Sequence, residues 1–543
     1  MSRFLHRSAA VFAGMAVFAS LASGYYHYIH FNGRSAPFTG IPEKFDLAAL
    51  PNRTVQFFVS EQSSMQLAPG DSTAALLSQI RSAAKVWSDV ETSELRVEFG
   101  GLTAPGTSHS RPAIEVSFDD VPPGLIAMGG PTVRTDSNEQ FVPISKSVVI
   151  IRSDLSSRPS WSESLHGTLV HEFGHALGLQ HSLTSSTMST QNTRATSKGR
   201  PLAADDIAGL SLLYPARSFA SSTGSISGTV TRSGQGVNLA SVVALAPNGP
   251  VVSALTNPDG TYKISGLPPR HSYYVYVHPL PPPLHGQTTN AGLIYPVDSE
   301  RQAFPPNGPF ETRFYPGTRQ PEAAIAVQAG STVENIDFEV QGKTSFGIHT
   351  VDTYSFPGST AVKPAFVSPA GGRPLIAASG SGLVSGDEPA RGLKVSIING
   401  PSLSVRSHPT ASSTYVLIDL DPRFLLSSDD NPRHLLFTLD DDIYVLPAAF
   451  YVTNRPPPEI SSIEPGVESS NHELVLSGAS FSHDTRILFD GVGARKKYDE
   501  STGRITVVPP AGPPGHRSTI VALNSDGQSS LLLQPENPPT HSY

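Results

Sequence analysis

The chain of 543 residues contains no cysteine. This absence excludes disulfide bonds, thiolate metal sites, cysteine nucleophiles and a lipidated N-terminal cysteine. Any metal ion in this protein must therefore be held by histidine, aspartate or glutamate side chains.

Charged residues are also few, at 15% of the chain, against roughly 25% in an ordinary globular protein. The formal net charge is -8, and no cluster of lysine and arginine stands out. With 38% hydrophobic residues, the composition excludes a highly charged disordered chain. It gives no electrostatic footprint for nucleic acid or an anionic membrane, so we expect neither as a partner. At about 150 residues per domain, the length predicts three or four domains.

Residues 1–24 have the organisation of an export signal. Arg3 and Arg7 precede an apolar run from Ala9 to Ala22, and small residues follow it. The alternative is a short uncleaved anchor, although the run is shorter than the ~20 residues that span a bilayer. In that alternative the aromatic residues that follow the run would lie at the membrane interface, namely Tyr25, Tyr26, Tyr28 and Phe31.

In either case we expect the remainder of the chain to lie outside the cytoplasm, whether secreted, periplasmic or attached to the surface. This remainder begins with an N-terminal extension at residues 25–48. Contact with a membrane is expected only if the signal segment stays uncleaved.

Residues 49–219 mix strands with helices. The apolar pattern predicts strands at Thr54–Ser60, Leu95–Phe99, Ala113–Phe118 and Ser147–Arg152, and a helix at Thr73–Val90. Ser160 and Glu163 form a Ser-x-x-Glu capping box, which predicts a second helix running to about Leu177. Asp205 and Asp206 suit the positive N-terminal end of a third helix.

Beyond residue 223 the character of the chain changes. Strand-like runs alternate with Gly, Pro, Asn and Asp turns, and no helical period is evident. This part of the chain therefore predicts all-β modules. Proline-rich stretches at residues 279–283 and 456–458 mark a long loop and a linker.

The segment HEFGHALGLQH, from His171 to His181, carries the most informative pattern. His171 and His175 lie one helical turn apart, about 40° round the axis, so both imidazoles can reach one metal ion. Gly178 can adopt a positive φ, which ends the helix and lets His181 approach the same ion. Three imidazoles leave the fourth position of a tetrahedral zinc site open, as in catalytic sites.

Glu172 follows the first of these histidines. It is placed to take a proton from a metal-bound water and to pass it to a leaving amine. The pattern therefore predicts one catalytic zinc ion and hydrolysis of an amide. The alternative is a solvated helix with coincidental histidines. We expect His166 and His109 to be surface histidines rather than further ligands.

The pattern HExxHxxGxxH resembles the signature of the metzincin zinc peptidases. Thr187-Met188-Ser189 resembles their Met-turn, whose methionine lies beneath the zinc site; ordinary core filling is the alternative for Met188. Ser182, directly after the third histidine, resembles the matrixin branch, which includes the matrix metalloproteinases. Ala83–Phe99 and Leu202–Tyr214 are similar to the first helix with its following strand, and to the last helix, of matrixins.

A further likeness concerns Gly124–Gly129, which resembles the matrixin edge strand that pairs with an extended substrate. Ala127 and Met128 would then contact the substrate, whereas a plain sheet edge is the alternative. The sequence departs from matrixins in lacking a switch cysteine, a recognisable structural zinc and calcium pattern, and a proline after Met188. It leaves open how latency is controlled and whether structural Ca2+ or a second zinc ion is bound.

The β modules carry resemblances of their own. Residues 224–341, with the hairpin turn Asp259-Gly260, resemble a carboxypeptidase regulatory-like sandwich of the transthyretin type. Residues 456–535, beginning with the run Glu459–Pro465, resemble an IPT/TIG domain of the immunoglobulin-like type. By weaker analogy, we expect residues 344–454 to form another immunoglobulin-like sandwich.

The predicted fold class is thus a multidomain chain, with an α+β metzincin-like domain followed by all-β sandwiches. The resemblance implies a secreted zinc endopeptidase that acts on proteins or peptides, while the β modules position it or bind substrate, a cell surface or polysaccharide. The rival hypothesis is a surface adhesin with a non-catalytic zinc domain, but such a remnant would not need the general base Glu172. Because every catalytic group lies within residues 49–219, we expect this segment alone to cleave unstructured peptides.

Purified protein is expected to hold about one zinc ion per chain, because the three histidines complete one open site and no cysteine can build another. His175→Ala should lose this ion, as measured by elemental analysis. Native protein without zinc, or full zinc content in the variant, would contradict the prediction.

Overall fold

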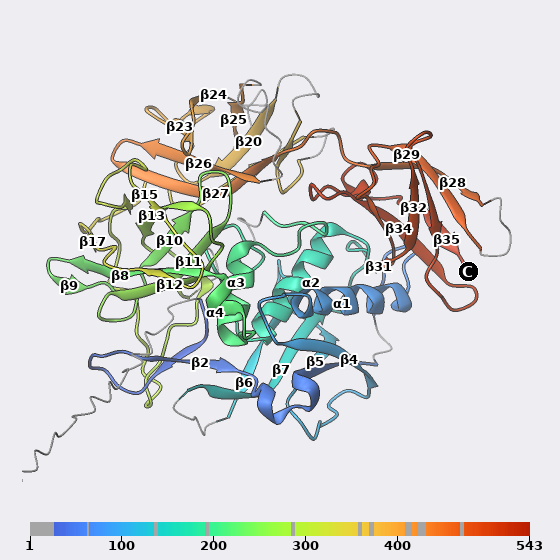
Figure 1. The fold of residues 1–543 in the computed structure, drawn as a ribbon, viewed down its shortest axis with the longest axis horizontal. Helices are drawn as coiled ribbons and strands as arrows, with labels where there is room; N and C mark the ends of the chain where they lie inside the picture. The colour runs from blue at the N-terminus through green and yellow to red at the C-terminus, as the bar shows by residue number, and fades with distance from the viewer. Residues whose placement is uncertain are drawn as a thin grey trace, which may run out of the picture.

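The computed structural model describes residues 26–543 apart from 62–64, 135–139, 191–194, 284–287, 357–360, 369–373, 408–414, 422–430 and 467–471. The export signal predicted at residues 1–24 lies outside the described residues. A mixed α/β part occupies the centre, and three β modules lie around it (Figure 1). Within the described ranges, the structure has no helix whose length and apolar character would allow it to cross a bilayer.

A seven-stranded sheet forms the base of the α/β part, in the order β1-β2-β7-β5-β3-β4, with β6 also paired to β7. The strands are β1 (Ile29–Phe31), β2 (Gly40–Lys44), β3 (Thr54–Ser60), β4 (Arg96–Thr103), β5 (Ala113–Asp119), β6 (Ala127–Val133) and β7 (Val142–Arg152). Strands β2, β7, β5, β3 and β4 are parallel, whereas β6 runs antiparallel to β7. This arrangement leaves β6 at an edge of the sheet.

Two long helices, α1 (Thr73–Ser88) and α2 (Glu163–Ala176), cover one face of the sheet (Figure 1). Trp87 of α1 is fully buried, and its indole nitrogen donates a hydrogen bond to the carbonyl of Val170 at 2.9 Å. Phe173 of α2 packs edge-on against Phe57 of β3, with ring centroids 5.4 Å apart. Large aromatic side chains of this kind dominate the energetics of a core, so they fix α2 against both α1 and the sheet.

Two shorter helices, α3 (Ala204–Leu213) and α4 (Phe219–Ser222), follow α2. Helix α3 lies between α2 and the first β module (Figure 1). The helices and strands predicted in residues 49–219 are therefore confirmed, with ends that differ by a few residues.

The N-terminal extension is part of this fold. Strand β2 joins the sheet through Glu43, which pairs with Val142 of β7. Tyr26, Tyr28 and Phe31 are 0%, 8% and 4% exposed within the protein. The alternative in which these described residues face a membrane is therefore wrong, because their rings fill the core instead.

The capping box predicted at Ser160 and Glu163 is wrong. The hydroxyl of Ser162 caps α2 and accepts from the backbone nitrogen of Leu165 at 3.2 Å. Ser160 instead donates its hydroxyl to Asp71 at 2.7 Å, and Glu163 accepts from two groups outside the helix. The Ser-x-x-Glu spacing points to the wrong serine, because Ser160 and Ser162 both precede the helix. Contacts with distant parts of the chain engage Ser160 and Glu163 instead.

The first β module contains two five-stranded sheets. Its strands are β8 (Gly224–Arg232), β9 (Gln235–Gly236), β10 (Ser241–Leu245), β11 (Val251–Leu255), β12 (Thr261–Leu267), β13 (Ser272–His278), β14 (Arg313–Phe314), β15 (Ala324–Ala326), β16 (Thr332–Val333) and β17 (Phe338–Glu339).

The second β module has eight strands in one sheet, ordered β18-β20-β25-β24-β23-β26-β27-β19, and a separate pair β21-β22. The strands are β18 (Val351–Tyr354), β19 (Phe366–Val367), β20 (Leu375–Gly380), β21 (Val384–Ser385), β22 (Glu388–Pro389), β23 (Lys394–Ile397), β24 (Ser402–Ser407), β25 (Tyr415–Asp419), β26 (Pro432–Leu439) and β27 (Asp442–Val452). Residues of β18 and β19, at the two ends of the sheet, share one hydrophobic core, so the sheet curls over on itself.

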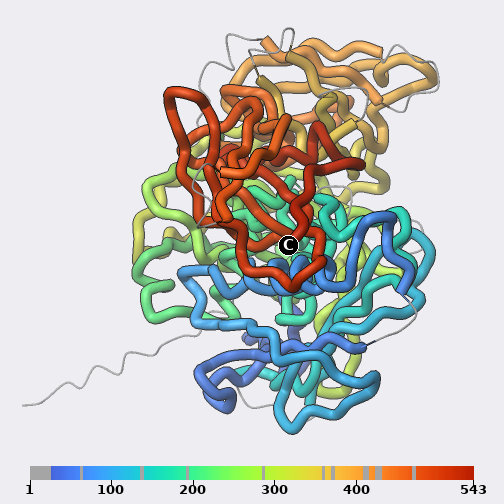
Figure 2. The backbone as a smooth tube through the Cα atoms, turned by 90° about the vertical axis from the view of Figure 1, so that its right-hand side faces the viewer, coloured from blue at the N-terminus to red at the C-terminus, as the bar shows by residue number. Residues whose placement is uncertain are grey.

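The third β module contains two four-stranded sheets and lies beside the helical layer (Figure 2). Its strands are β28 (Glu459–Pro465), β29 (Leu474–Ala479), β30 (Arg486–Phe489), β31 (Val492–Gly493), β32 (Arg495–Asp499), β33 (Arg504–Val508), β34 (Arg517–Leu523) and β35 (Thr540–Ser542). The multidomain, mostly β architecture is thus confirmed, while the transthyretin and immunoglobulin types stay predictions.

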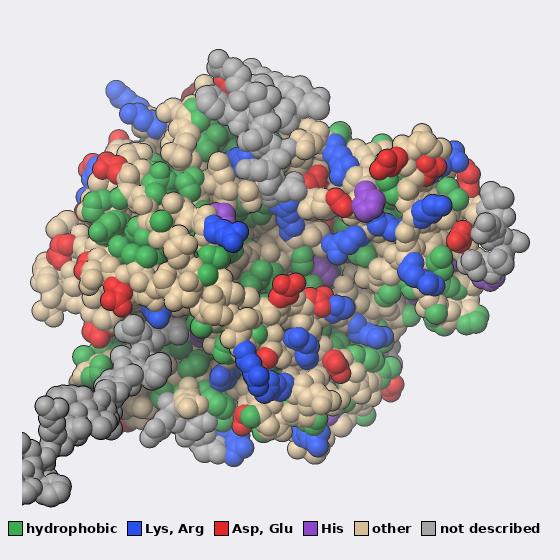
Figure 3. All heavy atoms as spheres, viewed as in Figure 1, with side chains coloured by type: hydrophobic (Ala, Val, Ile, Leu, Met, Phe, Trp, Pro, Cys, Tyr) green, Lys and Arg blue, Asp and Glu red, His purple; other side chains and the backbone are tan. Residues whose placement is uncertain are grey.

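Charged side chains of both signs are interspersed on the face viewed in Figure 3. This mixture agrees with the low charge content of the sequence.

Ser162→Ala should lower the unfolding free energy of the α/β part by about 1 kcal/mol, because helix α2 loses its N-cap. Ser162→Asp should stay near wild type, since aspartate caps well and suits the helix dipole. Trp87 is fully buried in this part, and Trp161 packs where it meets the third β module, so denaturant unfolding followed by fluorescence reports on both. If Ser162→Asp proves as damaging as Ser162→Ala, the capping assignment is wrong.

Candidate metal centre

Three histidines converge beside the sheet. His171 and His175 project from α2 with ring centroids 4.6 Å apart, and the ring of His181 lies 5.2 Å and 4.8 Å from theirs. Their potential ligand atoms all lie within 4.8 Å of one another. The structure therefore brings together the three side chains that the sequence pattern predicts as metal ligands.

Gly178 makes this convergence sterically feasible. Its φ is +104°, a conformation that other residues rarely adopt, and it directly follows Leu177, the C-cap of α2. A Cβ atom on Gly178 would lie 2.6 Å from the carbonyl oxygen of Glu43 in β2. Both the backbone conformation and the close approach of β2 thus require glycine, and the reversed chain then carries His181 back towards α2.

Two of the histidines are oriented by backbone carbonyls. Nδ1 of His171 lies 2.7 Å from the oxygen of Thr187, and Nδ1 of His175 lies 2.8 Å from the oxygen of Leu179. A carbonyl can only accept, so each Nδ1 carries the proton and each Nε2 keeps its lone pair. This is the arrangement found in metal-binding histidines, so these residues fit a zinc ion.

Met188 lies directly against the helix that carries two of the histidines. It is fully buried, and its carbonyl accepts a hydrogen bond from Ser182 at 3.0 Å. A Cβ atom on Gly174 would lie 2.3 Å from the sulfur of Met188 and 2.8 Å from the ring of Trp87. Glycine between the two helical histidines is therefore what lets the methionine approach α2.

Asp206 holds the turn at Met188, a role that sequence reasoning missed. Its carboxylate accepts from the backbone nitrogens of Met188 at 2.9 Å, Thr187 at 2.9 Å and Ala203 at 2.8 Å. Burial raises the pKa of Asp206, and these hydrogen bonds oppose that shift. The sequence placed Asp206 at the start of α3 correctly, but its partners in the turn lie too far along the chain to be read from local spacing.

Glu172 lies on α2 and is 7% exposed. A Cβ atom on Gly129 of β6 would lie 2.7 Å from the carbonyl oxygen of Glu172, so β6 passes close over this turn of the helix. Burial, and then the charges of Glu43 and Glu172, raise the pKa of Tyr28. Tyr28 therefore keeps a neutral phenol, and Glu172 lies near enough for its charge to act on that phenol.

Strand β6 overlaps the edge strand predicted at Gly124–Gly129 but begins only at Ala127. Ala127 is 3% exposed and Met128 is 43% exposed. Among the strands of the described residues, β6 pairs with β7 alone, so its other edge faces away from the sheet.

The two histidines predicted to lie on the surface take no part in this cluster. His166 is only 5% exposed, so its surface prediction is wrong, and burial together with nearby Lys198 lowers its pKa to about 3. The loop that carries Lys198 covers the side of α2 on which His166 lies. His109 is half-buried and stacks on Phe58, with ring centroids 4.0 Å apart.

Comparison with known proteins identifies three segments. Residues 64–215 match the family model of matrixin, residues 225–280 that of the carboxypeptidase regulatory-like domain, and residues 458–536 that of the IPT/TIG domain. These matches confirm the family resemblances drawn from the sequence. A matrixin segment supports a zinc metallopeptidase of the metzincin kind.

No curated protein matches the chain. Among solved structures, a match is the Bacteroides ovatus mixed-linkage glucan utilization locus protein SGBP-B in complex with a mixed-linkage heptasaccharide. It shares 12% identity, covers 54% of this chain and 56% of that one, and has a TM-score of 0.17. A likeness this weak carries no argument about function.

Gly174→Ala should weaken zinc binding about tenfold and destabilise the α/β part. Alanine gains up to ~1 kcal/mol of helix propensity, but overpacking against Met188 and Trp87 costs typically 1–3 kcal/mol. The matched control is Gly167→Ala in the same helix, where an added Cβ meets nothing within 4 Å. Zinc affinity is measured by competition with a chelator, and equal affinities for the two variants would contradict the packing argument.

Proposed function

We propose that this chain, which carries a matrixin segment at residues 64–215, is a secreted zinc-dependent endopeptidase. The observation that supports this most is the convergence of His171, His175 and His181, with Glu172 on the same helical turn as the first two. A site of this composition suits hydrolysis, because three neutral ligands leave room for water and substrate.

When bound by the three histidines, zinc would supply a Lewis acid that lowers the pKa of water and polarises the scissile carbonyl. The carboxylate of Glu172 would take a proton from the attacking water and deliver it to the leaving nitrogen. Its place next to His171 supports this role, because α2 fixes the carboxylate relative to the ligands. The carbonyl of Thr187 would hold His171 in the tautomer that ligation requires.

Strand β6 would bind the substrate as an added strand. Its outer edge has no paired strand within the described residues. Met128 of this strand is exposed, and the strand lies beside α2, the helix that carries His171 and His175. An extended peptide can pair with such an edge through backbone hydrogen bonds, while side chains enter alternate pockets. The close approach of Gly129 to the backbone carbonyl of Glu172 supports this role, because it brings β6 against the helix that carries the proposed general base.

The remaining parts of the proposal concern location and the β modules. Export rests on the basic, apolar and small regions of residues 1–24, which lie outside the described residues. The modules would position the enzyme or bind large substrates, since fold alone assigns them no chemistry.

Glu172→Gln should reduce peptide hydrolysis 10²- to 10⁴-fold, because it removes the basic carboxylate and keeps the side-chain volume. Zinc content and thermal unfolding should match wild type, since the imidazoles are unchanged. The measurement is kcat/KM on a pool of quenched peptides, with Glu98→Gln on the exposed side of β4 as the control.

Comparable turnover by Glu172→Gln would exclude Glu172 as the base. A wild-type protein that binds zinc but cleaves nothing in a broad peptide pool would favour the adhesin hypothesis instead.

A further inference from the structure

A buried carboxylate links the α/β part to the first β module. Asp205, on α3, is 0% exposed, and Ser253, on β11, is 1% exposed. The backbone nitrogen of Ser253 donates to Asp205 at 2.8 Å, and the Ser253 hydroxyl lies 3.1 Å and 3.0 Å from its two oxygens. A buried carboxylate depends on such donors, because water cannot replace them.

The same carboxylate reaches towards the metal centre. The hydroxyl of Thr184 donates to Asp205 from the segment between His181 and Met188. The Thr184 hydroxyl also lies 3.4 Å from that of Ser182, whose backbone nitrogen donates to Met188 at 3.0 Å. Ser253 is therefore connected to the turn beneath the histidines through one carboxylate and the chain between Ser182 and Met188.

Further contacts hold this segment against the module. The amide of Gln180, next to the third histidine, donates to the carbonyl of Ile294 at 2.8 Å and accepts from its nitrogen at 3.2 Å. The hydroxyl of Tyr26 donates to Ser241 of β10 at 2.7 Å. Leu255 of β11 belongs to the same hydrophobic cluster as the core of the α/β part.

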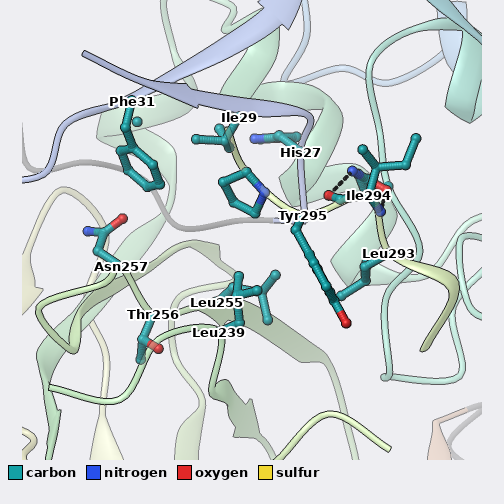
Figure 4. Close-up of a pocket in the computed structure, with 13 residues that line it drawn as sticks. His27, Ile29, Phe31, Leu239, Leu255, Thr256, Asn257, Leu293, Ile294 and Tyr295 are labelled. Carbon is teal, nitrogen blue, oxygen red and sulfur yellow. Dashed lines mark hydrogen bonds between the residues drawn. The ribbon is translucent and has the colours of Figure 1, made fainter. Parts of the chain in front are cut away.

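Figure 4 shows a pocket at this junction. His27, Ile29 and Phe31 of the N-terminal segment line one side of it, and Leu239 and Leu255 of the first β module line the other. The N-terminal segment is thus held between the module and the loop that carries the third histidine.

We propose that Ser253 is a positioning residue of the metal centre, which holds the turn at Met188 through Asp205 and Thr184. Its catalytic consequence rests on the proposed peptidase function. The first β module is then part of the metal site's support, although it contributes no ligand.

The sequence predicts that residues 49–219 alone cleave unstructured peptides, but the contacts of Asp205 with the first β module lead to the opposite expectation. Residues 49–219 contain every proposed catalytic group, but without the module they would expose Asp205 and the apolar surface that covers Leu255. We therefore expect this isolated segment to bind zinc weakly and to lose most of its activity on peptides.

The test uses the full chain with Ser253→Ala. Loss of the hydroxyl should weaken zinc binding about tenfold, the lower end of the 10- to 100-fold range for groups that orient metal ligands. The value of kcat should fall by a similar factor, while KM changes less than twofold. Ser253→Thr keeps a hydroxyl on the strand and should restore most of both properties.

The matched control is Ser518→Ala in the third β module. Ser518 is 3% exposed and donates its hydroxyl to Asp490, which is 4% exposed, at 2.8 Å. This variant loses the same kind of buried bond away from the histidines, so its zinc affinity and kcat should stay within twofold of wild type. Equal losses in the two variants would reduce Ser253 to a general stabilising role and overturn the proposal.

A double-mutant cycle with Thr184→Val tests the route. If both hydroxyls act through Asp205, the double variant should weaken zinc binding little more than the worse single variant. Wild-type zinc affinity in Ser253→Ala, or losses that simply add, would contradict the proposed route. The zinc measurements decide this point even if the wild-type chain cleaves no peptide, which would overturn only the peptidase function.

Discussion

The packing of the turn at Met188 against helix α2 is the contact on which the candidate site depends. The carbonyl of Thr187 orients His171 at 2.7 Å, and the sulfur of Met188 occupies the space that a side chain at Gly174 would take. One turn thus fixes the orientation of His171 and fills the underside of the helix. Metal ligands need such support, because a small misplacement weakens both binding and catalysis.

The support continues outward through two neighbouring aspartates. Asp206 binds the turn itself, and Asp205 binds both Thr184 and Ser253 of the first β module. Because both carboxylates are buried, each depends on its hydrogen-bond donors. The first β module supplies Ser253 as a donor to Asp205, so this module is physically joined to the candidate metal centre. Helix α3 therefore connects parts of the chain that resemble separate families.

Local patterns in the sequence predicted what local geometry determines. His171 and His175 are one helical turn apart, so helix geometry puts both on one side of α2. Glycine at position 178 can adopt a positive φ, which turns the chain back. The histidine cluster could therefore be predicted from the sequence. Apolar periodicity likewise located the two long helices, because each buries a continuous face.

The sequence predictions were wrong where contacts between residues far apart in the chain decide the position of a side chain. The sequence predicts Ser160 as a cap, but Asp71 accepts its hydroxyl from 89 residues away. The sequence predicts His166 on the surface, yet it is buried in the folded chain. Strand β2 joins the sheet by pairing with β7, which is distant in the sequence, and β1 in turn pairs with β2. Asp206 carried no signal beyond its place in α3, since its partners in the turn are reached only in the folded chain.

A single zinc ion held by His171, His175 and His181 is expected to make this chain a peptidase. The most direct test is to strip the full-length protein of metal, add zinc in steps, and measure cleavage of a peptide library. The expected result is that cleavage rises with zinc and reaches its plateau at about one equivalent per chain. Stoichiometric zinc binding to His171, His175 and His181 without any cleavage, or cleavage that is unaffected by metal removal, would contradict it.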